Sequence, residues 1–408
     1  QRAGHTPVVV MGGGTGLIGD PSGKTAERQL LDEPAVARNV EAQRPIFQAL
    51  LDLDPAKPNA ALLRNNLDWL GQLSYIEALR DIGKHFSVNM MIQKDSVRER
   101  LHAREHGISY TEFSYMILQS YDFLHLFEHD GVTIQCGGSD QWGNIVAGAD
   151  LIRRRTIVEG AEHVHGLAMQ EHLELEAGKW TRLTGEKTRA AAEELVGPRV
   201  FAFTAPLVTK SDGGKFGKTE SGAIWLTAHR TSPYAYYQFW LNAADADVGR
   251  YLRIFTFLRR DEIESLEQAH AANPGAREAQ RTLAREATTL LHGKPATEHA
   301  ESAARALFSG DVAHLDEATL RDVFAEVPSS DHDAGARAGE GRDLVTVLRD
   351  SGVATSNREA RELLASGSIS VNGRKVGPED RLTAADLLHG SLIAIRRGKK
   401  TWRLTRWN

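Results

Sequence analysis

The run Val8-Val9-Val10-Met11-Gly12-Gly13-Gly14 decides the fold of the first part of this chain. Four consecutive apolar residues that end in glycines are typical of a strand buried on both faces of a parallel sheet. A second such run, Val132-Thr133-Ile134-Gln135-Cys136, ends at Gly137-Gly138. Residues 35–51, 75–86 and 111–127 have helical patterns, so strands alternate with helices. Ligands of parallel α/β sheets bind at the carboxyl ends of the strands, and both glycine turns lie there.

The composition is that of a soluble globular protein. Of 408 residues, 41% are hydrophobic and 25% are charged, which predicts two or three domains. No apolar run approaches the ~18 residues that span a bilayer. The lone Cys136 excludes an internal disulfide and favours the cytoplasm. The net charge of −5 hides a basic tail, because residues 343–408 contain twelve Lys or Arg against seven Asp or Glu. Such a tail favours a polyanionic partner such as nucleic acid.

The second half of the chain changes character along its length. Residues 232–320 have a helical pattern throughout, and residues 328–341 form a polar, Gly- and Ala-rich linker. Short helices are expected at 344–350 and 357–366, followed by a hairpin at Val371-Asn372-Gly373-Arg374. The charged stretch 155–200 fits poorly and is interpreted as a surface insertion. Its His163 and His165 lack a firm third ligand for a metal.

The loop Lys215-Phe216-Gly217-Lys218-Thr219 follows the small residues Ser211-Asp212-Gly213-Gly214. Two ammonium groups on a flexible, glycine-rich loop suit a polyphosphate whose charge changes during transfer. A lone pair of lysines at this spacing is more often a solvated surface loop. Other residues must therefore decide the interpretation.

The glycine loop at residues 12–25 contains two nucleotide-binding patterns, and both are weak. Gly14-x-Gly16-x-x-Gly19 matches the dinucleotide fingerprint, but Asp20-Pro21 follows where that fold continues its helix. Gly19-x-x-x-Gly23-Lys24-Thr25 is one residue shorter than a P-loop. An NAD-dependent oxidoreductase is therefore a minor hypothesis.

Tyr115, Gln119 and Asp122 lie on one face of the helix expected at 111–127. Their neighbours are strongly apolar, and buried polar groups need partners, so this face is expected to line a pocket for a small polar ligand. The turn at 137–144 contains Asp140, which either accepts from ribose hydroxyls or caps the following helix.

In this order along the chain, the motifs resemble those of bacterial tyrosyl-tRNA synthetases, which are class I aminoacyl-tRNA synthetases. The resemblance is carried by residues 12–24, 86–89, 113–122, 137–144, 215–219 and 231–234. In that family, a loop like residues 215–219 is the K-M-S-K-S signature in its K-F-G-K-T form. The tail resembles an S4 RNA-binding domain in residues 356–361 and 367–373.

The resemblance implies an α/β fold with three domains. A Rossmann-like parallel-sheet catalytic domain would occupy residues 1–225, with an insertion near 155–200. An α-helical tRNA-binding domain would follow at 226–328, then a linker at 329–342 and a small α+β S4-type domain at 343–408. It also implies a cytoplasmic homodimer, away from membranes, that joins L-tyrosine to tyrosine tRNA. ATP would be a substrate, accompanied by Mg²⁺, with no tightly bound cofactor and no metal held by the protein.

The resemblance also assigns roles to residues. Asp20, Tyr115 and Gln119 would bind the tyrosine ammonium group, and Asp122 would accept from the phenolic hydroxyl. Gln141 would lie near the carboxylate and Asp140 on the ATP ribose. A ligand without a hydroxyl would leave the Asp122 carboxylate buried and unpaired.

The phosphates and the RNA would meet positive charges. Lys215, Lys218 and Thr219 are the expected catalytic group on the β- and γ-phosphates, with Lys24 and Arg28 on the pyrophosphate side. The expected RNA-binding residues are Arg358, Arg361, Arg396, Arg397, Lys399 and Lys400. Asn66 and Trp69 match a family segment near the site, but no contact is assigned to them.

One departure from the family leaves an alternative open. The second family signature, H-I-G-H, belongs upstream of residues 2–5, so we expect an N-terminal segment to be missing from this sequence. His163-Val164-His165-Gly166 has the wrong spacing and position to replace it. The alternative is a non-catalytic RNA-binding protein built on a synthetase scaffold.

Overall fold

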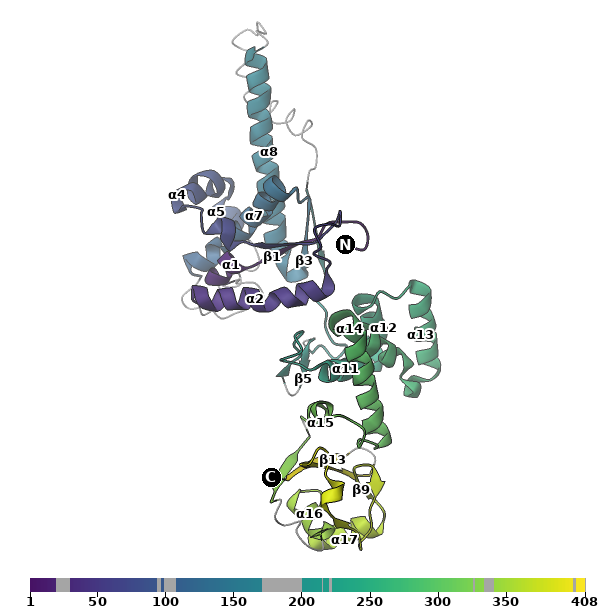
Figure 1. The fold of residues 1–408 in the computed structure, drawn as a ribbon. Coiled ribbons are helices and arrows are strands. Elements are labelled where there is room, and N and C mark those ends of the chain that lie inside the picture. The colour runs from purple at the N-terminus through teal and green to yellow at the C-terminus, as the bar shows by residue number, and fades with distance from the viewer. Residues whose placement is uncertain are drawn as a thin grey trace. The chain divides into compact units, whose positions relative to one another are not determined.

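The computed structural model describes residues 1–19, 30–93, 97–98, 108–170, 200–214, 216–219, 222–325, 327–333, 341–398 and 401–407. Side chains are not described at 157–170, 218, 219 and 222. The chain divides into two compact units, Gln1–Thr209 and Lys210–Asn408, which we call the N-terminal and C-terminal units (Figure 1).

Parallel strands run through the N-terminal unit, as the sequence predicts. Strand β1 (Val8–Met11) pairs in parallel with β2 (Leu62–Asn65), and β3 (Ile134–Gly138) pairs in parallel with β4 (Phe201–Ala205). The bounds of β1 are those predicted, whereas β3 starts two residues later than predicted and continues through both glycines. The described strands form two separate two-stranded sheets.

Helices cover these strands and supply the core. They are α1 (Gly13–Ile18), α2 (Glu33–Leu50), α3 (Leu67–Leu70), α7 (Tyr110–Asp130) and α8 (Trp142–Gln170). Helix α7 begins where the Ser109 side chain accepts from the Glu112 amide, and it ends at Gly131 in the left-handed conformation. Phe123 and Leu124 of α7 pack with Leu151 and Ile152 of α8, so a hydrophobic core holds α7 in place.

The helix predicted at 75–86 is present but changes type along its length. A short α-helix, α4 (Tyr75–Glu77), continues as a π-helix over Ala78–Ile82 and a 3₁₀-helix over Gly83–His85. Helix α5 (Val88–Ile92) follows. Only Ile82 of the π-helix is buried, so packing fixes this segment at a single point.

The C-terminal unit starts with a small hairpin and continues as helices, confirming the helical pattern of 232–320. Strands β5 (Lys218–Thr219) and β6 (Gly222–Ala223) pair antiparallel. The helices are α11 (Pro233–Leu241), α12 (Asp245–Phe255), α13 (Arg260–Ala272), α14 (Glu278–Ser309) and α15 (Glu317–Val323). Helix α14 is kinked at Gly293, where φ is +81°, just before Pro295.

The last part of the C-terminal unit combines two helices with a five-stranded sheet. Helices α16 (Leu344–Asp350) and α17 (Asn357–Ala365) lie where the sequence predicts them. The strands of this sheet are β7 (Ser329–His332), β9 (Ile369–Val371), β10 (Arg374–Lys375), β12 (Leu392–Arg397) and β13 (Thr401–Trp407). Strands β8 (Arg342–Asp343) and β11 (Arg381–Leu382) pair antiparallel in a separate two-stranded sheet. The predicted hairpin is confirmed between β9 and β10, with positive φ at Asn372 and Gly373.

Part of the predicted linker is a strand. The sheet order is β10-β9-β12-β13-β7, and β7, within the predicted linker 329–342, pairs in parallel with β13. The sequence Ser-Ser-Asp-His lacks the alternation of apolar and polar residues that predicts a strand. Its partner β13 lies far along the chain, so no local hairpin signal indicates the pairing either. A shared core also joins Phe324 and the end of α14 to Trp402 and Leu404 of β13.

Candidate active site

The carboxylate of Asp122 lies in the interior of the N-terminal unit, with an exposure of 5%. It accepts two hydrogen bonds, from Trp69 Nε1 at 2.8 Å and from Asn66 Nδ2 at 2.9 Å. Both donors come from α3 or its N-cap position, whereas Asp122 belongs to α7. The site therefore depends on the packing of two helices that lie far apart in the sequence.

Asn66 connects this carboxylate to the start of α1. Its Oδ1 accepts from the Gly14 amide at 2.7 Å and from the Thr15 amide at 3.4 Å, and its Nδ2 also donates to Thr15 Oγ1. The first amides of α1 are thus occupied by a side chain, and the helix ends at Gly19. This arrangement disfavours the dinucleotide fingerprint, which needs those amides for a pyrophosphate.

The glycines of this loop have a packing role. A Cβ on Gly13 would lie 2.0 Å from Oδ1 of Asn65, so a larger residue would push α1 away from the end of β2. The close approach of α1 to β2 therefore requires glycine.

Burial and hydrogen bonding act in opposite directions on Asp122. Burial raises the pKa of this carboxyl group and the hydrogen bonds from Asn66 and Trp69 lower it, and the net result is a pKa of about 7. A ligand hydroxyl that donates to the carboxylate would favour the ionised form. The site is therefore suited to bind a hydroxyl-bearing ligand near neutral pH.

A second polar cluster lies at the carboxyl end of β3, one of the two ends where the sequence predicts a ligand. Asn144 Nδ2 donates to Gln119 Oε1 at 2.8 Å, and Gln119 Nε2 donates to Gln141 Oε1 at 3.3 Å. Gln141 Nε2 in turn donates to Asp140 Oδ2 at 3.3 Å. This chain of amides connects α7 to the turn after β3 and ends at the exposed Asp140.

The structure brings together the predicted residues of the N-terminal unit that it describes. Tyr115 and Asp122 are buried on α7, Gln119 is half-buried between them, and Gln141 contacts Gln119. The predicted Asp20, Lys24, Arg28, Lys215, Lys399 and Lys400 lie outside the described residues. Lys218 and Thr219 form β5 in the C-terminal unit, without described side chains.

Sequence reasoning missed three residues of this site. Asn66 and Trp69 were given no contact, yet both donate to Asp122. Asn144 was noted only as part of a turn, yet it bridges Gln119 and Gln141. The available signal was an asparagine and a tryptophan three residues apart, which share one face of a short helix.

The predicted RNA-binding arginines differ in how they are held. Arg358 pairs with Glu362 at 2.9 Å, and Arg397 pairs with Glu359 at 3.0 Å. Arg396 donates to the Phe308 carbonyl at 3.1 Å and lies over the Trp402 ring. Arg361 is exposed, and it has no ion pair with the part of the chain that the structure describes. Arg361 is therefore the most available of the four for a phosphate.

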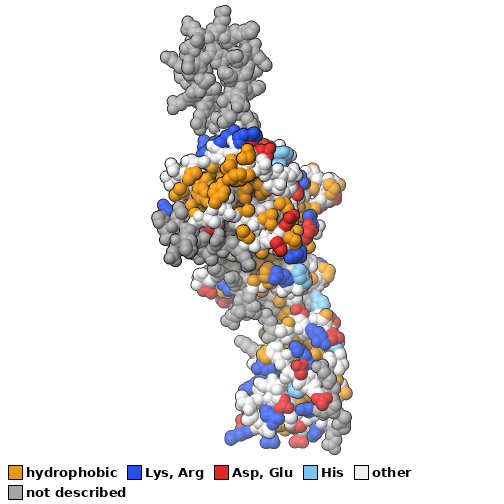
Figure 2. Space-filling view, turned by 90° about the vertical axis from the view of Figure 1, so that its left-hand side faces the viewer, with side chains coloured by type: hydrophobic (Ala, Val, Ile, Leu, Met, Phe, Trp, Pro, Cys, Tyr) orange, Lys and Arg blue, Asp and Glu red, His pale blue; other side chains and the backbone are white. Residues whose placement is uncertain are grey.

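An apolar surface covers one face of the N-terminal unit (Figure 2). Its exposed side chains come from α4, the following π-helix, α5 and the start of α7. They are Tyr75, Ile76, Leu79, Val88, Met90, Ile92 and Tyr110. Tyr75 and Tyr110 hydrogen-bond to each other, and this bond raises the pKa of Tyr110. We call these seven residues the apolar face.

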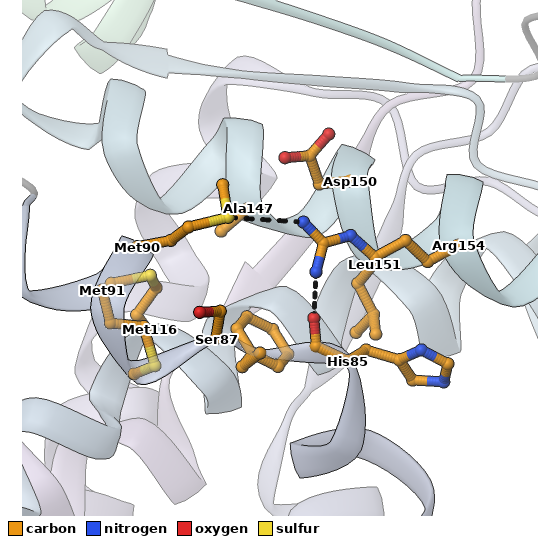
Figure 3. Close-up of a pocket in the computed structure, with 10 residues that line it drawn as sticks. His85, Ser87, Met90, Met91, Met116, Ala147, Asp150, Leu151 and Arg154 are labelled. Atoms are coloured by element: carbon orange, nitrogen blue, oxygen red, sulfur yellow. Dashed lines mark hydrogen bonds between the residues drawn. The ribbon is translucent and has the colours of Figure 1, made fainter.

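A narrow pocket of about 40 Å³ lies beside this face (Figure 3). Arg154 of α8 lines it, donating to the His85 carbonyl and to the sulfur of Met90 at 3.9 Å. Burial lowers the pKa of His85, and nearby Lys84, Arg155 and Arg154 lower it further. Arg154 thus holds one edge of the apolar face through its contact with Met90.

Within the described ranges, no group of three or more His, Cys, Asp or Glu side chains could hold a metal ion. None of the helices that the structure describes is long and apolar enough to cross a membrane.

Comparison with known proteins shows the family to which the chain belongs. Residues 1–309 match the family model of class I tRNA synthetases (W and Y), and residues 319–405 match the tyrosine–tRNA ligase SYY-like C-terminal domain. The chain is 46% identical over its whole length to the tyrosine–tRNA ligases of Roseiflexus castenholzii and Geobacillus stearothermophilus, covering 86% of each. A C-terminally truncated mitochondrial tyrosyl-tRNA synthetase of Aspergillus nidulans superposes with a TM-score of 0.57 at 28% identity, over 74% of this chain and 77% of that one.

The fold is that of a class I aminoacyl-tRNA synthetase, with an α/β N-terminal part and a C-terminal mixed sheet. Within that class the similarity extends over the whole chain. The chain belongs to the tyrosine–tRNA ligases.

Proposed function

We propose that this chain activates L-tyrosine with ATP and then transfers it to the 3′ end of tyrosine tRNA. A tyrosine carboxylate oxygen attacks the α-phosphorus of ATP, and the bond to the leaving pyrophosphate breaks. A ribose hydroxyl of the tRNA then attacks the carbonyl carbon of tyrosyl-adenylate, and AMP leaves. The observation that carries the proposal is the buried Asp122 carboxylate with its two donors, Asn66 and Trp69.

Asp122 would select tyrosine by accepting from its phenolic hydroxyl. A carboxylate has more acceptor positions than its two donors occupy, so it can accept a third hydrogen bond. Phenylalanine would bury this carboxylate against a ring edge without that bond. The resulting loss of free energy is the basis of selectivity.

The remaining contacts of tyrosine would come from α7 and the turn after β3. Tyr115 and Gln119, together with Asp20, would bind the ammonium group, and Gln141 would lie near the carboxylate. The amide chain through Asn144 supports this role, because it fixes the orientation of both glutamines. Asp140 is exposed at the end of that chain, which suits a contact with the ATP ribose.

The phosphates of ATP would be neutralised by cations. Lys215, Lys218 and Thr219 would act on the β- and γ-phosphates, with Lys24 and Arg28 toward the pyrophosphate. Mg²⁺ would accompany ATP as part of the substrate. Tyrosine tRNA would contact the C-terminal unit, with Arg358, Arg361, Arg396, Arg397, Lys399 and Lys400 as candidates.

Tyrosine-dependent exchange of pyrophosphate into ATP tests the first step. We expect the full-length protein to catalyse it. The Asp122→Ala variant should lower kcat/KM for tyrosine by about 10- to 100-fold, because the hydroxyl loses a charged acceptor. Asp68→Ala, which removes an exposed carboxylate from α3, is the matched control. Absence of exchange in the full-length protein would favour the alternative of a non-catalytic RNA-binding protein.

The apolar face supports a further proposal, that the protein is a homodimer. Seven exposed apolar side chains gathered on one face are typical of a protein interface, because monomers rarely leave such a patch in water. Arg154 supports its edge by holding Met90 and the His85 carbonyl. Two copies of the chain could cover each other's apolar face by symmetry.

A further inference from the structure

An aromatic ring attaches the loop that contains the signature lysines to the helices of the C-terminal unit. The ring of Phe216 stacks on Phe255, with centroids 5.2 Å apart and planes at 12°. It also meets Tyr251 edge-on at 5.2 Å, and Phe239 and Trp240 at 5.7 Å each. We call these four residues of α11 and α12 the aromatic socket.

The socket is a firm part of the unit. Trp240 and Tyr251 are buried, and Trp240 also contacts Tyr251 and Phe255 directly. Aromatic rings at these separations attract one another beyond the effect of burial alone. The ring of Phe216 therefore binds to a preformed surface.

A second attachment lies five residues earlier in the chain. The amide and the hydroxyl of Ser211 both donate to Asp247 Oδ2 of α12, each at 3.1 Å. Asp247 is buried whereas Ser211 is exposed, so the two hydrogen bonds are partly buried. Ser211 and Phe216 thus attach the loop to the same helix, α12.

Between and beyond these attachments, the backbone forms closed turns. The Lys210 amide donates to the Gly214 carbonyl at 3.1 Å, and the Ile224 amide donates to the Gly217 carbonyl at 3.0 Å. Gly213 and Gly217 have positive φ angles of 79° and 76°. These glycines let the chain turn sharply on both sides of Phe216, whose ring is one of the two attachments of the loop to α12.

We propose that Phe216 is a positioning residue: its ring, held in the aromatic socket, fixes where the loop presents Lys218 to the phosphates of ATP. This inference rests on the proposed function, because it assumes that Lys218 acts in adenylate formation. Phe216 does not touch the substrate in this role. It acts through the backbone of its own loop.

The physical reason is that tyrosine binding and the alignment of Lys218 with the phosphates depend on different residues. Tyrosine binding depends on Asp122, which belongs to the N-terminal unit, so releasing the loop leaves that pocket intact. A catalytic cation displaced by about 1 Å can cost about 100-fold in rate. Loss of the ring should therefore lower kcat of adenylate formation and leave tyrosine affinity unchanged.

A cavity of about 400 Å³ beside the ring makes the truncation informative. It is lined by Phe216, Phe239, Trp240 and Tyr251, and also by Lys210 and Asp247. In a Phe216→Ala variant, the volume of the ring would join this cavity, and water could enter. The loop would then lose its contact with the aromatic socket, while α11 and α12 keep their contacts with α14.

The test compares three variants in pyrophosphate exchange. Phe216→Ala should lower kcat about 100-fold, with the dissociation constant of tyrosine, measured by equilibrium dialysis, within twofold of the parent. Phe216→Met, apolar and of similar size, should restore most of kcat. Phe308→Ala, which removes a ring that is 87% exposed at the end of α14, is the matched control and should behave as the parent.

A second readout does not depend on activity. Trypsin cleavage after Lys218, followed by mass spectrometry, should be faster in Phe216→Ala than in the parent and near normal in Phe216→Met. Ser211→Ala, which removes one of the two hydrogen bonds to Asp247, should show a smaller change of the same kind. It replaces Phe216→Ala if that variant fails to fold.

Each outcome decides one of the two proposals. A parental kcat in Phe216→Ala, or a loss that Phe216→Met does not restore, overturns the positioning role. A parent without exchange overturns the proposed function instead, and the trypsin result then still decides whether Phe216 holds the loop. Equal cleavage rates in all variants would show that the socket does not hold it.

Discussion

At Asp122 one carboxyl group couples the stability of the N-terminal unit to pH. Burial raises its pKa to about 7 in the folded protein, well above the 3.8 of a free aspartate. The folded state therefore binds the proton more tightly than the unfolded state. The contribution of this group to the free energy of unfolding is fully present below about pH 4 and is lost as the pH rises toward 7.

This coupling predicts a pH-dependent difference between the protein and its Asp122→Asn variant. Between pH 4 and pH 7 the parent should lose on the order of 4 kcal/mol from this group, at 1.4 kcal/mol per unit of pKa shift. The neutral variant should not lose it. Denaturant unfolding of both at pH 5 and pH 8 measures the difference, and a gap independent of pH would contradict it.

A second prediction at this scale concerns Trp69. Trp69→Phe removes the Nε1 donor to Asp122 and keeps a ring that stacks on His125. We expect kcat/KM for tyrosine to fall by about 10- to 100-fold, because a hydrogen bond to a charged group is lost.

Trp142→Phe, an exposed tryptophan at the start of α8, controls for the change of ring. Steady-state exchange at varied tyrosine concentration is the measurement. Equal kcat/KM values for Trp69→Phe and Trp142→Phe would show that the hydrogen bond from Trp69 Nε1 to Asp122 does not affect tyrosine activation.

At the scale of elements, the sequence predicted regular structure best where local signals and packing agree. The predicted bounds of β1 and α16 are those of the structure, and α7 extends the predicted helix by a few residues. The segment after Tyr75 was predicted as a helix and instead changes type along its length. Hydrophobic spacing cannot distinguish helix types, since i+3, i+4 and i+5 bonding give similar faces over so few turns.

These irregular helices bear the apolar face, which gives a prediction about assembly. Ile76 is 68% exposed, the highest exposed fraction among the seven residues of this face. Ile76→Asp would place a charge in the proposed interface and should convert a dimer to a monomer, because an unpaired buried charge is strongly unfavourable.

Sedimentation equilibrium of both proteins over a range of concentrations checks this outcome. Leu226→Asp, at an exposed apolar position of the C-terminal unit, is the control and should leave the assembly unchanged. A monomeric parent would contradict the homodimer, and a dimeric Ile76→Asp protein would show that the apolar face is not the interface.

At the scale of the whole molecule, the sequence predicted which side chains of α7 lie on one inward face better than it predicted their contacts with other elements. Tyr115, Gln119 and Asp122 could be found because they share one helical face. The donors Asn66 and Trp69 could not, because their contact with Asp122 depends on how α3 and α7 pack. The strand β7 was missed for the same reason, since its partner β13 lies far along the chain.

The shared core of the C-terminal unit changes how RNA binding should be tested. Deleting residues 343–408 would remove Trp402 and Leu404 from the core that they form with Phe324 and α14. A deletion would therefore disturb folding as well as RNA binding. A point variant of an exposed arginine separates the two.

Arg361→Ala is the variant that the structure favours. We expect a higher KM for tRNA in the charging reaction, a weaker dependence of RNA binding on salt, and unchanged pyrophosphate exchange. Arg321→Ala, which removes an arginine paired with Glu317 on α15, is the control. Equal loss of charging and exchange would count against a separate RNA-binding role.

The parallel pairing of β7 with β13 also sets an order of events during synthesis. When the ribosome has made β7, the strand that must lie beside it has not yet been translated. Until β13 arrives, the edge of β7 and the apolar side chain of Phe324 remain without this partner. The pairing of β7 with β13 can therefore form only after β13 has been translated. A nascent chain that pauses before β13 would expose surfaces to which a chaperone can bind.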